Sequence, residues 1–405
     1  MKTKYHSVTV LAGGLVAALC LLGGQSRADM TTNEQELAAA NAGFAFNLLQ
    51  QITATKPGTN IFISPYSVST ALQMVSAGAE GTTRTEMQQV LGTIDMTQSN
   101  LDRANRKLID LINSKNADFI LDTANALWYR SGTPIKQSFI ETDETYFGAR
   151  VEGLNFNKPS AAKSINAWAS EETHGKITQI VTPPIAPDIS LFLANAVYFL
   201  GKWETPFPTN NTTNMAFYPS GGGQTNVPMM QQTGGFNYCE GSDYQAVQLP
   251  YKGGDLAMYV FLPGTNSSPA ALLGEMSGSW WQAAQTNFSG QGGTVILPKF
   301  TLHYAVDLVQ SLEALGMTNV FTPEADLAGI SRWPMFISDV KQQAYVDVDE
   351  KGTEATAVTT ISVGCTAVTG IPPQPFQMTV DRPFLFLIAD QQAGTILFMG
   401  AVYLP

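Results

Sequence analysis

The sequence has few of the residues that build catalytic or metal-binding centres. Its 405 residues contain three histidines and three cysteines. No His-Glu-x-x-His or Cys-x-x-Cys spacing occurs, so the usual zinc motifs are excluded. The chain also lacks a Gly-x-Ser-x-Gly elbow and a glycine-rich phosphate loop, which removes the usual support for a hydrolase or a nucleotide-binding protein. We therefore expect no catalytic residues, no metal site and no cofactor.

Charged residues are also scarce, at 14% of the chain, and acidic side chains outnumber basic ones by 33 to 22. The net charge of −11 opposes binding to phosphate backbones, so nucleic acid is excluded as a partner. Hydrophobic residues make up 44% of the chain, whereas a disordered chain has few apolar residues and a high charge density. The chain is therefore expected to fold around a large core.

The N-terminus reads as a secretory signal. Two lysines precede an apolar stretch from Val8 to Leu22, and Ser26 and Ala28 supply the small residues that a cleavage site needs. We expect residues 1–28 to be removed and residues 29–405 to form a single secreted or periplasmic domain. Retention as a membrane anchor is the alternative, but the stretch is short for a span and no second long apolar run follows it.

The apolar pattern of the remaining chain indicates both helices and strands. Leu37, Phe44, Leu48 and Ile52 fall on one helical face. The run from Leu191 to Phe199 is apolar, aromatic and β-branched, which is typical of a strand buried on both faces. Further strand-like runs are 257–262, 294–297, 344–348, 384–389 and 396–403. The pattern predicts one α+β unit.

The most informative segment runs from Glu350 to about Arg382. It shows no helical period, and roughly thirty residues are too many for a simple connection inside a compact domain. Residues 353–363 are nevertheless rich in β-branched side chains, lack proline and follow the alternating strand pattern of 344–348. The segment can therefore form a strand, although it follows a strand as a long loop. This indicates two alternative conformations, one as a loop outside the sheet and one as a strand within it.

These residues carry a specific resemblance. The matching blocks are Asn60–Leu72 with Gly78–Thr83, Asn195–Trp203, Glu350–Ala357, and Asp381–Phe386 with Phe398–Gly400. In order and content they closely resemble the serpins, the serine protease inhibitor family, along nearly the whole mature chain.

The resemblance implies a serpin fold of three β-sheets and eight to nine helices, with residues 350–379 as an exposed reactive-centre loop. It implies a protease inhibitor rather than an enzyme. A target serine protease attacks the loop and becomes acylated, and the cleaved loop then inserts into the main sheet and traps the covalent complex. The runner-up is a non-inhibitory serpin that acts as a binding or storage protein.

The hinge of the loop favours inhibition. In the family's register, Thr353, Ala355 and Ala357 would face the core of the inserted strand, and all are small and uncharged. A buried unpaired charge at Thr353 would oppose insertion, and Gly352 provides a flexible pivot. The predicted hinge comprises Gly352, Thr353, Glu354, Ala355, Thr356 and Ala357.

The family's usual spacing from Glu350 places the attacked bond between Thr366 and Ala367, with Cys365 and Val368 beside it. Small residues at this bond imply proteases with a small primary pocket, such as elastase-like or subtilisin-like enzymes, with papain-like cysteine proteases as a further class. No Arg or Lys lies between Glu354 and Arg382.

Seven residues match family positions that control opening of the main sheet. Glu350 and Lys299 match an ion pair, and Trp203 matches a tryptophan near it. Ser64, Ser67 and Asn195 match a buried polar cluster, which accounts for an amide inside the apolar run of 191–199. The family usually has a His-Lys pair where this chain has Gln342-Gln343. Gln342 can still donate and accept hydrogen bonds, but without the pH response of an imidazole.

The resemblance also bears on partners. Heparin-activated members need a basic helix, whereas Arg103, Arg106 and Lys107 are isolated basic residues in an acidic chain. We therefore expect no activation by heparin. After removal of the signal we expect a monomer with no membrane contact.

Overall fold

The computed structural model describes residues 30–112, 119–186, 189–353 and 374–405. Several sequence predictions lie outside the described residues. These are the signal at 1–28, the hinge positions Glu354, Ala355, Thr356 and Ala357, and the reactive-bond positions Cys365, Thr366, Ala367 and Val368.

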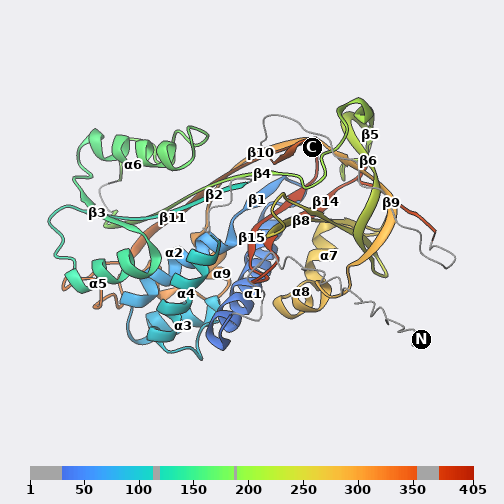
Figure 1. The fold of residues 1–405 in the computed structure, drawn as a ribbon. Helices are drawn as coiled ribbons and strands as arrows, with labels where there is room; N and C mark the ends of the chain where they lie inside the picture. The colour runs from blue at the N-terminus through green and yellow to red at the C-terminus, as the bar shows by residue number, and fades with distance from the viewer. Residues whose placement is uncertain (1–29, 113–118, 187–188, 354–373) are drawn as a thin grey trace, which may run out of the picture.

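Nine α-helices and three shorter helical segments occur in these described ranges, and Figure 1 labels the α-helices. The α-helices are α1 (Thr32–Thr55), α2 (Pro65–Gly78), α3 (Gly81–Leu91), α4 (Gln98–Ile112), α5 (Gln137–Thr142), α6 (Pro159–Glu172), α7 (Pro269–Glu275), α8 (Gly278–Ala284) and α9 (Val309–Ala314). The shorter segments are η2 (Asp143–Phe147), η3 (Thr209–Asn211) and η4 (Asn319–Phe321).

The strands form a six-stranded and a nine-stranded sheet. The six-stranded sheet has the order β10 (Phe300–Asp307), β11 (Ile337–Asp349), β12 (Gly352–Thr353), β4 (Leu191–Lys202), β2 (Phe119–Arg130) and β3 (Arg150–Leu154). The nine-stranded sheet has the order β1 (Ile61–Ile63), β15 (Ile396–Val402), β14 (Phe384–Asp390), β8 (Leu256–Pro263), β7 (Tyr244–Pro250), β6 (Thr225–Glu240), β9 (Ser289–Pro298) and β13 (Phe376–Thr379), with β5 (Thr213–Phe217) paired to β6.

The predicted α+β fold is confirmed, but the described strands form two hydrogen-bonded networks where three sheets were expected. The nine-stranded sheet combines two smaller groups of strands that the expectation counted as separate sheets. The reason is that β6, with 16 residues, is long enough to take part in both groups. Its C-terminal end pairs with β7, and its N-terminal end pairs with β5. One continuous strand therefore joins the two smaller sheets.

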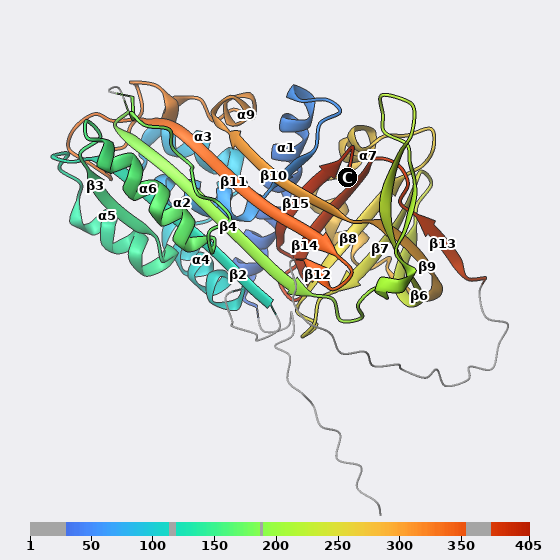
Figure 2. The same ribbon diagram turned by 90° about the horizontal axis from the view of Figure 1, so that it is seen from above.

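The six-stranded sheet is covered on both faces. On one face α6 packs over β2 and β4, as Figure 2 shows, and Trp168 of α6 lies edge-on against Trp128. On the other face α2 packs against β2 and β4, and α1 lies beside α2 with Leu48 and Ile52 in the core. This double cover explains why β4 is apolar at nearly every position. None of the helices in the described ranges is long and apolar enough to cross a bilayer.

The last residue of β14, before the turn to β15, is a buried acid, Asp390. Its Oδ1 accepts a hydrogen bond from the Ala393 N–H at 2.5 Å. Burial, aided by the negative charge of Asp255, nevertheless raises the pKa of Asp390 from 3.8 to about 6. The folded chain thus holds this proton more tightly than the unfolded chain, so stability falls as pH rises from about 4 to about 6.

We expect Asp390→Asn to raise the thermal midpoint at neutral pH and to remove part of this pH dependence. A shift of about two pKa units corresponds to roughly 3 kcal/mol of unfolding free energy. Thermal unfolding followed by circular dichroism across the acidic range checks the expectation. A variant that keeps the full dependence of the wild type would contradict it.

Candidate functional site

The six-stranded sheet has a fork between β4 and β11. The two strands pair directly in parallel from Ile337 and Leu191 to Ala344 and Val197. Beyond that point they part, and β12 lies between them, with Thr353 paired to both Val348 and Gly201. Figure 2 shows β12 at this end of the sheet. We call the line between β4 and β11 the seam, and its divergence point the fork.

The chain enters the fork through a tight turn after β11. The Asp349 Oδ1 accepts hydrogen bonds from the Lys351 N–H at 2.7 Å and the Gly352 N–H at 3.2 Å. Gly352 has a φ of 156°, and a Cβ there would overlap the carbonyl oxygen of Gly201. Only glycine brings the backbone this close to β4.

Glu350 anchors the turn from the side. The Lys299 Nζ lies 2.8 Å from the Glu350 Oε2, and the Thr212 hydroxyl donates to Oε1 at 2.8 Å. Burial alone would raise the pKa of this carboxyl, but these hydrogen bonds and the charge of Lys299 hold the pKa below its usual value. The anchor is therefore present at neutral pH and is lost only as the carboxyl becomes protonated in acid. Sequence reasoning found the ion pair but missed Thr212.

Thr353 faces the protein core. It is fully buried, and its hydroxyl lies 2.7 Å from the Tyr251 hydroxyl. Tyr251 stacks on Trp203 at 4.7 Å between ring centroids, and the Trp203 Nε1–H donates to the Asp349 carbonyl at 2.9 Å. Trp203 and Tyr251 thus hold both ends of the turn. The sequence analysis assigned no role to Tyr251, which lies in the run Leu249-Pro250-Tyr251-Lys252-Gly253.

A buried amide pair ties the seam together below the fork. Asn195 of β4 and Gln342 of β11 are register partners, and the Gln342 Nε2 donates to the Asn195 Oδ1 at 2.8 Å. The Asn195 Nδ2 donates to the Asn125 Oδ1 on β2 at 2.7 Å and to the Ser67 hydroxyl. This amide therefore connects three strands with α2. Asn125 was missed because β2 gives no sequence sign of facing β4 at that position.

Gln342 also binds the start of α2. It accepts a hydrogen bond from the Ser64 N–H at 3.0 Å and donates to the Ser64 carbonyl at 2.9 Å. The Ser64 hydroxyl in turn donates to the Leu397 carbonyl on β15 at 2.7 Å. Each of these groups is buried and paired, which an imidazole at Gln342 would also allow but with a charge that depends on pH.

Opening the seam breaks this network. A strand inserted between β4 and β11 moves them apart by one strand spacing, about 4.8 Å. The Gln342 amide cannot then reach Asn195, so both side chains need new partners. The structure thus brings together Ser64, Ser67, Asn195 and Gln342 at the middle of the seam, and Trp203, Lys299, Glu350, Gly352 and Thr353 at the fork.

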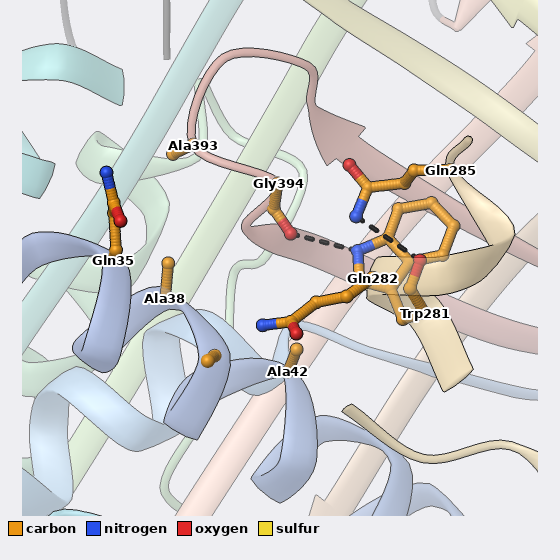
Figure 3. Close-up of a pocket in the computed structure, with 9 residues that line it drawn as sticks. Gln35, Ala38, Ala42, Trp281, Gln282, Gln285, Ala393 and Gly394 are labelled. Carbon is orange, nitrogen blue, oxygen red and sulfur yellow. Dashed lines mark hydrogen bonds between the residues drawn. The ribbon is translucent and has the colours of Figure 1, made fainter. Parts of the chain in front are cut away.

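Pockets also occur outside the seam, and two of them, one beside α6 and one between α2, α4 and β2, have cavities of about 400 and 300 Å³. The described ranges hold no group of three His, Cys, Asp or Glu side chains that could bind a metal ion. Figure 3 shows a pocket between α1, α8 and the β14–β15 turn, where the Trp281 Nε1–H donates to the Gly394 carbonyl at 2.9 Å. Its cavity of about 10 Å³ has room for about one water molecule.

Known proteins of one family resemble the chain along nearly its whole length. The family model "Serpin (serine protease inhibitor)" matches residues 39–405. A serpin-like protein of Methanosarcina acetivorans is 35% identical over 380 residues, which is 93% of this chain and 89% of that protein.

Solved structures agree with this. Human thyroxine-binding globulin in complex with thyroxine superposes with a TM-score of 0.84 at 26% identity, over 92% of this chain and 99% of that one. Native protease nexin-1 with heparin superposes with a TM-score of 0.82 at 30% identity, over 92% of this chain and 100% of that one.

We expect Gln342→Ala to destabilise the intact protein, because it leaves the Ser64 N–H and the Asn195 carbonyl without a partner. Each unpaired buried polar group costs about 1–3 kcal/mol, so the free energy of unfolding should fall by about 2–4 kcal/mol. The measurement is the thermal midpoint. Gln343→Ala is the matched control, because the neighbouring amide faces outward and donates only to the Gln179 carbonyl at 2.7 Å. Equal midpoints for the two variants would show that Gln342 does not tie the seam.

Proposed function

The chain belongs to the serpin family, and within it we propose that this protein is a secreted suicide-substrate inhibitor of serine proteases. The protease serine attacks the Thr366 carbonyl, the Thr366–Ala367 peptide bond breaks, and an ester to the serine forms as the Ala367 amine leaves. The freed loop then inserts along the seam before water can hydrolyse the ester. The protease remains covalently attached.

The single observation that carries this proposal is that β12 already lies between β4 and β11. Gly352 and Thr353 already pair with both flanking strands, so the first inserted position exists in the intact chain. Thr353 is small, uncharged and buried against Tyr251. A strand that continued from it would run between β4 and β11, whose direct pairing ends at Val197 and Ala344.

The target class rests on the loop sequence. The residues around the proposed bond are small and uncharged, so we propose elastase-like or subtilisin-like targets, with papain-like cysteine proteases as a second class. The protein supplies no nucleophile, since the chemistry belongs to the attacking protease.

The alternative is a non-inhibitory serpin, and thyroxine-binding globulin is a relative that has been solved in complex with thyroxine. Two observations favour inhibition. The hinge carries no bulky or charged residue at Thr353, and Thr353 already lies buried between β4 and β11.

Protease nexin-1 has been solved with heparin, but we propose that polyanions do not activate this chain. On α4, Arg106 is paired with Asp110 at 2.8 Å, and Arg103 donates to Asn100 at 2.9 Å. The remaining cation of that group, Lys107, provides little electrostatic attraction for a polyanion in a chain with a net charge of −11. We also propose export by the N-terminal signal and a monomeric state.

The central experiment mixes the protein with a neutrophil-type elastase and with subtilisin. We expect an SDS-resistant complex with at least one of them, and mass spectrometry should locate the cut at or next to Thr366. The cleaved protein should also unfold at a higher temperature, because the inserted strand adds hydrogen bonds to the sheet. Cleavage without complex and without a gain in thermal stability would support the non-inhibitory alternative.

Thr353→Arg should convert the inhibitor into a substrate. Position 353 is already buried between β4 and β11 in the intact chain, and an unpaired guanidinium there is strongly unfavourable. Residue 353 of the variant should therefore leave the sheet and deprive insertion of its first position, so the number of inhibitor molecules cleaved per complex formed should rise about tenfold or more. Glu354→Arg is the matched control, because alternate residues of a strand face opposite sides and position 354 would face away from the core. Normal trapping by Thr353→Arg would contradict the insertion argument.

A further inference from the structure

A buried carboxyl group without a partner lies where η2 packs against α4. Asp143 is the first residue of η2, its exposed fraction is 0%, and both of its carboxyl oxygens are buried without a hydrogen-bond partner. Among the described residues it is the one carboxyl group that lacks partners on both oxygens. Buried carboxyl groups are ordinarily paired or hydrogen-bonded, because an unpaired charge is costly to remove from water. The burial of Asp143 therefore has no compensation within the described chain.

A second acid lies near Asp143 on α4. Asp102 is in the second turn of this helix and is 8% exposed. Burial and, after it, the charge of Asp102 raise the pKa of Asp143 well above its usual value. Because neither oxygen of Asp143 has a hydrogen-bond partner, the two carboxyl groups interact through their charges but are not bonded to each other.

The amide of Gln98 adds a further oxygen. Gln98 and Asp102 are four residues apart and so lie on one face of α4. The Gln98 Nε2 donates to the Asp102 Oδ1 at 2.7 Å, and the Gln98 Oε1, on the same amide carbon, is buried without a partner. Apart from that one bond, the three side chains offer oxygen acceptors and no donor. Such a set suits a cation better than an anion or an apolar group.

The basic side chains of α4 do not neutralise this set. Arg106 is paired with Asp110 at 2.8 Å. Burial raises the pKa of Asp102, although its hydrogen bond and the charge of Arg103 oppose the shift. Asp143 has no bond to either arginine. Two buried acids thus share one nearby opposing charge among the described residues.

The backbone at Asp143 is also unusual. The segment η2 is π-helical and continues α5 directly. Wide turns of this kind are rare in proteins and occur frequently at functional sites. Here the π-helical turn begins at the residue whose carboxyl group has no partner. An uncommon backbone form and an uncompensated acid therefore coincide at one position.

We propose that Gln98, Asp102 and Asp143 bind a hard divalent cation such as Ca²⁺ between α4 and η2. Hard cations bind carboxylate and amide oxygens, and Ca²⁺ accepts them in a flexible geometry. Two ionised carboxylates carry two negative charges, which a divalent ion neutralises, whereas a monovalent ion leaves one of them buried and unpaired. Gln98 is partly exposed, so water can reach the ion on that side and complete its coordination.

The expected affinity is modest. The described ranges hold no group of three acidic or other strong metal ligands, and the proposed set has two carboxylates and one amide. Ca²⁺ affinity follows the number of charged ligands, so we expect a Kd of about 10⁻⁴–10⁻³ M, the range of extracellular calcium modules. The site shares no residue with the seam or the fork, and the proposal does not rest on the proposed function.

The test measures Ca²⁺ binding to the intact full-length protein after metals are removed with a chelator. At neutral pH we expect calorimetric titration to show one ion per chain. Saturating CaCl₂ should also raise the thermal midpoint, since a ligand that binds only the folded state stabilises it. NaCl at equal ionic strength should not reproduce the shift, because it only screens charges. Absence of both binding heat and midpoint shift would overturn the proposal.

Three variants locate the ion. Asp143→Asn should abolish the Ca²⁺ shift and yet be at least as stable as the wild type without Ca²⁺, because it removes an unpaired buried acid and keeps its shape. Asp102→Asn should raise the Kd about tenfold or more, since it removes one ligand charge. Asp110→Asn is the matched control, because Asp110 is an exposed α4 aspartate paired with Arg106, and it should respond as the wild type. Ca²⁺ binding that survives in Asp143→Asn, or that Asp110→Asn removes equally, would contradict the assignment.

Discussion

The architecture depends on the way β4 and β11 are held together. These strands are distant in sequence, and they pair along a short parallel ladder whose middle carries the hydrogen-bonded side chains of Asn195 and Gln342. Both amides are buried, so neither can exchange its partner for water without moving the strands. The seam therefore stays closed as long as this contact holds, and any new strand must displace it.

Three sets of contacts act at different places on that seam. The amide network works on the inner face, near the middle. At the fork, the turn held by Glu350, Trp203 and Tyr251 directs the chain into the gap. On the outer face, His174 and Lys176 contact Tyr198 and Tyr345, the first pair of residues beyond direct contact. Under the proposed function, these restraints would set how fast the sheet opens and leave the energy of the inserted state unchanged, which is what a kinetically trapped fold requires.

The sequence allowed much of this to be predicted. The amphipathic face of α1 and the doubly buried β4 follow from apolar spacing, and the structure contains both. The side chains of Ser64, Asn195 and Gln342 were expected to meet, and they do. The contacts that escaped prediction join distant positions: Tyr251 meets Thr353 across 102 residues, and Thr212 meets Glu350 across 138. Each partner looks ordinary in its own segment, so local pattern cannot reveal the pair.

The sequence by itself determined the α+β character and the strand β4 that is buried on both faces, because these depend on composition and on short-range periodicity. The tertiary structure alone decided that β6 joins two smaller sheets into one, that Gly352 and Thr353 already lie within the fork, and that His174 and Lys176 contact strands on opposite sides of the seam. The physical reason is that pairing between remote strands is selected by packing of the whole chain. A segment able to form a strand does so only where two others leave a gap of one strand's width.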